Sequence, residues 1–353
     1  MKKPLKLLLL YTVLYLTIFL IVNPQLCLKA AQSAINLCVD AVIPSLFPFF
    51  VCSGLLCALG FSAICSHFLS PVMRPLFNLP GAGALTLFMG ILSGYPVGAA
   101  TTVDLYKTGQ CTKAEAERML AFCNNSGPMF IIGMVGSGCL GNETAGLYLY
   151  ISHIIAAMAV GLIFRFYKST AQNLRTLPPS FTENKITAIF SLGGIIDSSV
   201  FSILKVCGFV IFFAVFVKAL PDNPYLYSFV EITGGIKALS QNTTGFTLPF
   251  ISFFLALSGL SVLFQVHAII QSTGLSLKPY IWGKLLQGVL SFIITLIIFK
   301  VFPFSQETFA QSTDSVFTPS PVSLVFSSIA ITIFSTFILA CIMIPLSLKK
   351  KTS

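Results

Sequence analysis

The stretch PGAGALTLFMGILSGYPVGAATTVD, residues 80–104, decides the kind of fold that this sequence can adopt. It is apolar and long enough to cross a membrane, because a transmembrane helix needs about 20 mostly apolar residues. Ser93-Gly94-Tyr95-Pro96 interrupts it near its centre, and glycine and proline break helices. Non-helical backbone at membrane depth is tolerated only where protein or a water-filled cavity surrounds it. The stretch therefore predicts a broken helix in a polytopic membrane protein; close helix packing through small residues is the alternative interpretation.

The composition of the whole chain points to the same class of protein. Of its 353 residues, 56% are hydrophobic and only 9% are charged, and the mean hydropathy is +0.90. A soluble domain carries about 25% charged residues, so a soluble protein of this size could not cover its surface. This excludes a cytosolic enzyme, a disordered chain and a nucleic-acid-binding module, although the formal net charge is +10. We predict an all-α polytopic membrane protein whose partners include the lipid bilayer but no nucleic acid.

Polar segments divide the apolar stretches into regions. The lysines before the first stretch would suit a signal peptide, but no small-x-small cleavage site follows Asn23-Pro24, which favours a retained helix. The predicted regions are an N-terminal transmembrane helix at 1–30, a first repeat at 31–167, a polar linker at 168–185, a second repeat at 186–301, a polar loop at 302–321, and a C-terminal transmembrane helix with a basic tail at 322–353.

The two long apolar regions resemble each other weakly. A shift of 165 residues places Ser93-Gly94 on Ser258-Gly259 and Lys113 on Lys278. Chance in apolar sequence could produce part of this match, but we interpret it as two related helical repeats with broken helices or re-entrant hairpins. In transporters built from inverted repeats, the substrate site lies at the repeat interface near the midplane. The loop charges, among which we count Lys284, leave the relative orientation of the two copies open.

Polar residues at the interruptions are candidates for binding a solute. Asn124-Asn125-Ser126-Gly127-Pro128 precedes an apolar helix whose N–H groups would attract an anion, and a plain interhelical turn is the alternative. Arg74 could pair with a carboxylate, although an interfacial anchor explains it equally well. The predicted substrate-binding residues are Ser93, Gly94, Tyr95, Pro96, Asn124, Asn125, Ser126, Gly127 and Arg74.

Glu231 is a carboxylate inside a short apolar segment. Ionisable residues within a membrane are costly and by default suggest function, whereas a helix end at the membrane interface is the alternative. We expect Glu231 to bind a coupling cation or proton, or to pair with a lysine. Asp104 and Lys205 are weaker candidates of the same kind. The predicted gating or coupling residues are Glu231, Thr233, Ser258 and Gly259.

Motifs that carry catalysis or hold cofactors are missing from the sequence. It has no phosphate-binding Gly-rich loop followed by Lys-Ser/Thr, no Gly-x-Ser-x-Gly and no His-Glu-x-x-His. Its ten cysteines contain no Cys-x-x-Cys pair, and His67, His153 and His267 stand far apart. We therefore expect neither an enzyme nor a metal or other cofactor.

Four motifs in the first half resemble a known family. They are VIPSLFPFF at 42–50, MRPLF at 73–77 followed by Pro80-Gly81, the interruption at 93–96 with its neighbours, and AEAER at 114–118 leading to FCNNSGP at 122–128. Together they are similar to the YlbJ-type sporulation integral membrane proteins, the stage V group that carries a nucleoside-recognition gate domain. The second half is similar mainly in hydropathy and in Glu231-x-Thr233-Gly234-Gly235.

The resemblance implies both a fold and a function. The gate domain is similar to part of the concentrative nucleoside transporter fold, which has paired hairpins and broken helices. Members of the group move dipicolinic acid, a flat aromatic dianion, from the mother cell across the outer forespore membrane during endospore formation. Such a substrate needs oriented N–H groups and an arginine, and Phe49, Phe50 and Tyr95 could supply a slot for its ring.

Two other functions fit the same residues. One is a secondary transporter for nucleosides or another small solute, and the other is a membrane protein of the spore envelope that transports nothing. For a transporter we expect a small-molecule anionic substrate and a coupling cation or proton as partners, with a homo-oligomer left open.

Overall fold

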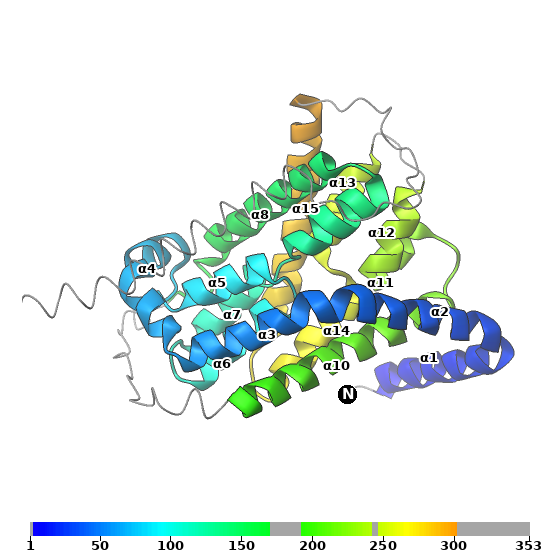
Figure 1. Cartoon of the computed structure of the whole chain (residues 1–353), viewed down its shortest axis with the longest axis horizontal. Helices are drawn as coiled ribbons and strands as arrows, with labels where there is room; N and C mark the ends of the chain where they lie inside the picture. The colour runs from blue at the N-terminus through cyan, green and yellow to red at the C-terminus, as the bar shows by residue number, and fades with distance from the viewer. Residues whose placement is uncertain (1–2, 170–191, 242–245, 302–353) are drawn as a thin grey trace, which may run out of the picture. The chain divides into compact units, whose positions relative to one another are not determined.

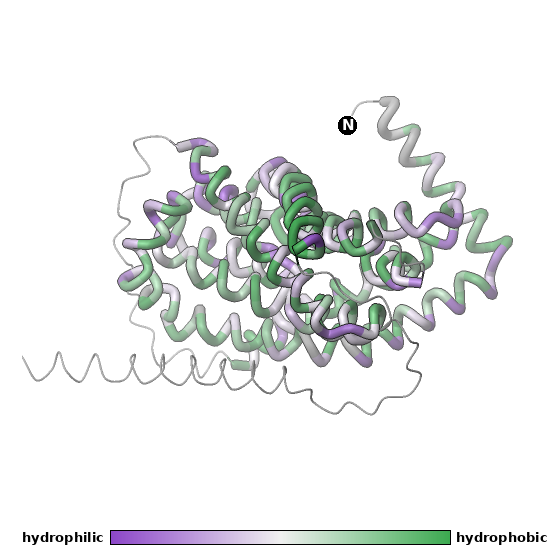
Figure 2. The backbone as a smooth tube through the Cα atoms, turned by 90° about the horizontal axis from the view of Figure 1, so that it is seen from above, coloured by the Kyte–Doolittle hydropathy of each residue, from purple (hydrophilic) through white to green (hydrophobic). Residues whose placement is uncertain are grey.

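The computed structural model describes residues 3–169, 192–241 and 246–301. Every regular element in these residues is a helix, and four helices are long and apolar enough to cross a membrane. Hydrophobic residues run along most of the helical backbone (Figure 2). The four candidate spans are Glu143–Phe164, Leu192–Val217, Thr247–Ile270 and Lys278–Val301. The prediction of an all-α polytopic membrane protein is therefore confirmed.

Three predicted regions lie wholly or mostly outside the described residues. The polar loop at 302–321 and the C-terminal helix with its basic tail at 322–353 lie outside them entirely. Of the polar linker at 168–185, only Lys168 and Ser169 are described. The described part thus holds the N-terminal helices and the helices of both predicted repeats.

The N-terminal region is bent. The helix α1 (Lys3–Val22) stops before Asn23, and α2 (Pro24–Leu37) begins with a proline, whose missing N–H is not needed in the first turn of a helix. The two helices meet at 100°, so the predicted single helix at 1–30 is instead a broken span or a re-entrant loop. The chain continues through η1 (Cys38–Val42), α3 (Ile43–Ala58) and α4 (Phe61–Phe77).

The stretch at 80–104 forms a broken helix. The first half of this helix ends at Leu92, and the second half begins at Val97. Gly94 between them has a φ of 88°, which glycine adopts without strain. The predicted interruption is therefore present in the structure. The helices of this region are α5 (Gly83–Leu92), α6 (Val97–Lys107), α7 (Lys113–Phe122), η2 (Met129–Cys139) and α8 (Glu143–Phe164).

The second region contains a hairpin and another broken helix. The helices are α10 (Leu192–Val217), α11 (Pro224–Val230), α12 (Ile232–Ser240), α13 (Thr247–Leu257), α14 (Gly259–Ile270) and α15 (Lys278–Val301). The hairpin of α11 and α12 is tight, because a Cβ on Gly235 would overlap the backbone of Ser228. The α13–α14 break falls at Ser258 and Gly259, with φ values of 71° and 70°. It coincides with the α5–α6 break under the 165-residue shift of the sequence, while the repeat itself stays a prediction.

Helix α15 lies in the middle of the packing. It contacts α7 and α8 from the first region and α13 from the second (Figure 1). The crossing with α7 is close, because a Cβ on Gly283 would overlap the carbonyl of Ala121. Small residues that let backbones approach are the usual solution for helix packing in membranes. This packing brings side chains of α15 next to the end of α7.

Gly90 provides a test of this close packing. A Cβ at this position would overlap the carbonyl oxygen of Cys123, so the backbone would have to move. Overpacking a well-packed core costs about 1–3 kcal/mol. We expect Gly90→Ala to lower the melting temperature of the protein in detergent. The control is Gly208→Ala on α10, where an added Cβ meets no atom within 4 Å; equal melting temperatures for the two variants would contradict this packing.

Candidate functional site

Two of the predicted motifs lie against each other. The interruption Ser93–Pro96 and the turn Asn124–Gly127 are together called the crossing here. A Cβ on Gly94 would come within 2.7 Å of the amide nitrogen of Gly127. All of these residues are buried except Tyr95, which is half-buried. The eight residues predicted from two separate stretches therefore lie together, while their role as a binding site stays a prediction.

Hydrogen bonds from the turn hold three helices together. The Oδ1 of Asn124 accepts from the N–H of Ala99 in the first turn of α6, at 3.3 Å. The Nδ2 of Asn125 donates to the carbonyl of Phe122 at 2.8 Å, and the Oγ of Ser126 donates to the carbonyl of Leu255 on α13 at 3.2 Å. The amide and hydroxyl groups of the turn, which were predicted to bind a solute, are thus partly used within the protein.

Three buried side chains that sequence reasoning missed complete the crossing. Gln287 of α15 donates to the Oδ1 of Asn125 at 2.9 Å and accepts from Lys284 at 2.8 Å. His153 of α8 accepts from the N–H of Ser126 through Nε2, at 3.2 Å. Lys284 is 2% exposed, which corrects its interpretation as a loop charge. The signal in the sequence was a lysine followed by a glutamine three residues later inside an apolar helix.

The break of the second region also reaches the crossing. The side chain of Tyr280 lies beside both Asn124 and Ser258. Gly259, whose φ is in the left-handed region, packs against backbone carbonyls at the end of α11. A Cβ added to Gly259 would lie 3.3 Å from the carbonyl oxygen of Phe229. The two breaks and the tip of the α11–α12 hairpin therefore lie close together.

Glu231 occupies the tip of that hairpin. Its Oε1 accepts from the N–H of Thr233 at 2.9 Å, and its Oε2 accepts from the N–H of Gly234 at 2.7 Å. The carboxylate is buried and caps the N-terminus of α12, as in the helix-end alternative. It also lies within electrostatic range of Tyr95. The position therefore suits the gating or coupling role, which stays a prediction for Glu231, Thr233, Ser258 and Gly259.

Arg74 is the predicted substrate-binding residue that lies elsewhere. It belongs to the last turn of α4, where its charge acts on Arg118 of α7. Arg118 donates to the carbonyls of Asn78 and Tyr167, and the preceding residue Glu117 binds Lys168 at 2.7 Å. That hydrogen bond raises the pKa of Lys168. This polar cluster surrounds the early turns of α7, whereas the crossing follows its last turn.

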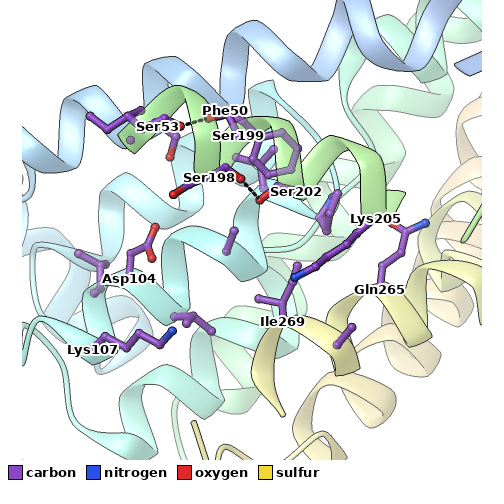
Figure 3. A pocket seen from close by; sticks show the side chains of 18 of the residues that line it. Phe50, Ser53, Asp104, Lys107, Ser198, Ser199, Ser202, Lys205, Gln265 and Ile269 are labelled. Atoms are coloured by element: carbon purple, nitrogen blue, oxygen red, sulfur yellow. Dashed lines mark hydrogen bonds between the residues drawn. The ribbon is translucent and has the colours of Figure 1, made fainter. Parts of the chain in front are cut away.

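A cavity of about 780 Å³ adjoins the crossing. It lies between α3, α6, α10 and α14, and Pro96 and Val97 are part of its wall. Figure 3 shows Ser198, Ser202 and Lys205 of α10 around it, with Asp104 of α6 and Gln265 of α14. Pockets for small molecules usually measure about 300–1,000 Å³. The cavity is therefore large enough for a small solute, and it contains the weaker sequence candidates Asp104 and Lys205.

Comparisons with known proteins agree with the motif resemblance. Residues 40–171 match the family model Gate, described as nucleoside recognition. The chain is 33% identical to the sporulation integral membrane protein YlbJ of Bacillus subtilis (strain 168), with 81% of each chain covered. No solved structure matches the chain.

Proposed function

The chain belongs to the family of the sporulation integral membrane protein YlbJ, and on that basis we propose that it is a membrane transporter of dipicolinic acid. It moves this pyridine-2,6-dicarboxylate from the mother cell across the outer forespore membrane during endospore formation. This makes it a solute carrier of the sporulating cell rather than an enzyme.

The cavity next to the crossing is the observation that carries this proposal. It opens among helices that include the candidate spans at 192–217 and 247–270, and it is lined by serines, by Asp104 and by Lys205, which forms no ion pair with a carboxylate among the described residues. Hydroxyls and an ammonium group suit a solute that carries two carboxylates. The cavity ends at Pro96, where the α5–α6 helix is broken. We interpret the cavity as the entrance and the crossing as the place where the substrate is held.

Transport then requires the crossing to open toward one side of the membrane at a time. Discontinuous helices and re-entrant hairpins at a repeat interface are the usual elements of such alternating access. In this chain they are the α5–α6 break, the α13–α14 break and the hairpin tipped by Glu231. Glu231 is the group that we assign to a coupling cation or proton, because it is a buried carboxylate beside both breaks.

Spore composition tests the proposed function. The dipicolinate content of spores is measured in a strain that lacks this protein, after confirming that its mother cells still synthesise dipicolinate. Spores that lack dipicolinate, formed in mother cells that still synthesise it, would support the proposal. Spores with the normal content would contradict it, and would favour either a nucleoside transporter, as the description of the Gate model suggests, or an envelope protein that transports nothing.

A further inference from the structure

Lys284 is a buried lysine for which the described residues provide no ion-pair partner. It lies inside the candidate span α15, and its ammonium group donates to the Oε1 of Gln287 at 2.8 Å. Among the described residues no carboxylate forms an ion pair with it: Glu117 binds Lys168, and both oxygens of Glu231 accept from backbone N–H groups. An ammonium group has three donors, and leaving a charge buried and unpaired costs several kcal/mol. Lys284 therefore requires a functional explanation.

Polar atoms without partners gather around the same place. Five buried side-chain atoms at the crossing or beside it form no hydrogen bond of regular geometry with the described residues: Ser93 Oγ, Tyr95 Oη, Asn124 Nδ2, His153 Nδ1 and Tyr280 Oη. Tyr280 nevertheless lies against Asn124 and Ser258, and Tyr95 lies against Ser126. Buried polar groups in native proteins nearly always have a partner, so a cluster of unpartnered ones points to a missing ligand. Lys284 is next to this cluster, because its charge acts on both Cys123 and His153.

These unpartnered atoms can all donate a hydrogen bond. An amide nitrogen such as Asn124 Nδ2 is a donor only, and hydroxyl groups can rotate to donate. His153 accepts from Ser126 through Nε2, so the proton of the neutral ring lies on Nδ1 and makes that atom a donor. A cation together with several free donors is the arrangement that binds a carboxylate.

We propose that Lys284 is the counter-charge for one carboxylate of the transported dicarboxylate, which also accepts hydrogen bonds from Asn124, His153 and Tyr280. This inference rests on the proposed function and names the residue that recognises the substrate. The substrate reaches the site from the cavity, whose wall includes Pro96 next to the crossing. An uncharged nucleoside would leave Lys284 unpaired, so the same residue selects against it.

Binding of two related pyridines tests this inference. Purified full-length protein is titrated with radiolabelled pyridine-2,6-dicarboxylate and with pyridine-2-carboxylate, which has a single carboxylate. The variant Lys284→Met keeps the length of the side chain and removes its charge. The control Lys278→Met makes the same change in the exposed first turn of the same helix. Lys284→Gln is the second uncharged variant and Lys284→Arg keeps the charge.

The expected result is weaker binding of both ligands, because each of them places a carboxylate at Lys284. Lys284→Met and Lys284→Gln should bind each ligand at least about 10-fold more weakly than the wild-type protein, Lys278→Met and Lys284→Arg do, which corresponds to about 1.4 kcal/mol. Unchanged affinity of Lys284→Met and Lys284→Gln for the two ligands would overturn the role of Lys284. Wild-type protein that binds neither ligand would instead overturn the proposed function and this inference with it.

Discussion

Replacing Asn125 with aspartate is expected to reduce dipicolinate uptake at least about 100-fold, because it places a negative charge where an anion must bind. Asn125 is fully buried in the crossing, and its Oδ1 accepts from Gln287 at 2.9 Å. The substitution leaves the side-chain volume nearly unchanged, but it replaces the Nδ2 that donates to the carbonyl of Phe122, so it tests charge and hydrogen bonding rather than packing. A carboxylate here would repel the substrate, and it would also give Lys284 an internal counter-charge through Gln287.

The control for this prediction is Asn142→Asp. Asn142 caps the N-terminus of α8 by accepting from the N–H of Ala145 at 2.9 Å. Asparagine and aspartate are about equally good N-cap residues, so the same chemical change should leave uptake unaffected. Uptake is measured in proteoliposomes with matched amounts of each protein. If the uptake by Asn125→Asp were equal to the uptake by Asn142→Asp, the crossing would not be the anion site.

Reversing the charge of Lys205 is expected to have the second-largest effect. This residue lines the cavity through which the substrate is proposed to enter. Two unit charges 4 Å apart in water-like surroundings interact by about 1 kcal/mol, so changing attraction into repulsion costs about 2 kcal/mol, or roughly 30-fold in affinity. We expect Lys205→Glu to raise the substrate concentration needed for half-maximal uptake by at least about 10-fold. This increase should become smaller at high salt, because salt screens the charge interaction.

Lys218→Glu is the matched control for the cavity. Lys218 follows the last residue of α10, is exposed, and lies over the ring of Tyr227 at 5.8 Å from its centroid. It is not part of the cavity wall, so its reversal should leave the half-maximal concentration unchanged. Equal shifts for the two variants would mean that only the net charge of the protein matters and that the cavity is not the entrance.

Local sequence was sufficient to predict the first interruption. Glycine and proline at 93–96 end one helix and start another. The second break lies at Ser258-Gly259, the position on which the shift of 165 residues places Ser93-Gly94, although no break was predicted there. The bend before Pro24 had a local signal too, a proline suited to a first helical turn, but residues 1–30 were predicted as one helix. Backbone breaks can be predicted because they depend on one or two residues.

The partners within the site could not be predicted in the same way. Gln287 meets Asn125 only because α15 crosses α7 closely at Gly283, 162 residues away along the chain from the turn. Lys284 looked like a loop charge because it lies six residues after the start of a helix whose boundary the sequence does not mark sharply. The serines and Lys205 of α10 did carry a helical signal, since Ser198, Ser202 and Lys205 are spaced four and three residues apart.

Uptake of dipicolinate by the purified protein tests the central claim most directly. The full-length chain is reconstituted in liposomes, and accumulation of radiolabelled dipicolinate is followed over time against protein-free liposomes. We expect saturable uptake that unlabelled dipicolinate competes and an uncharged nucleoside does not. Uptake no faster than in protein-free liposomes, or uptake that a nucleoside abolishes, would contradict the assignment of this protein as a dipicolinate transporter.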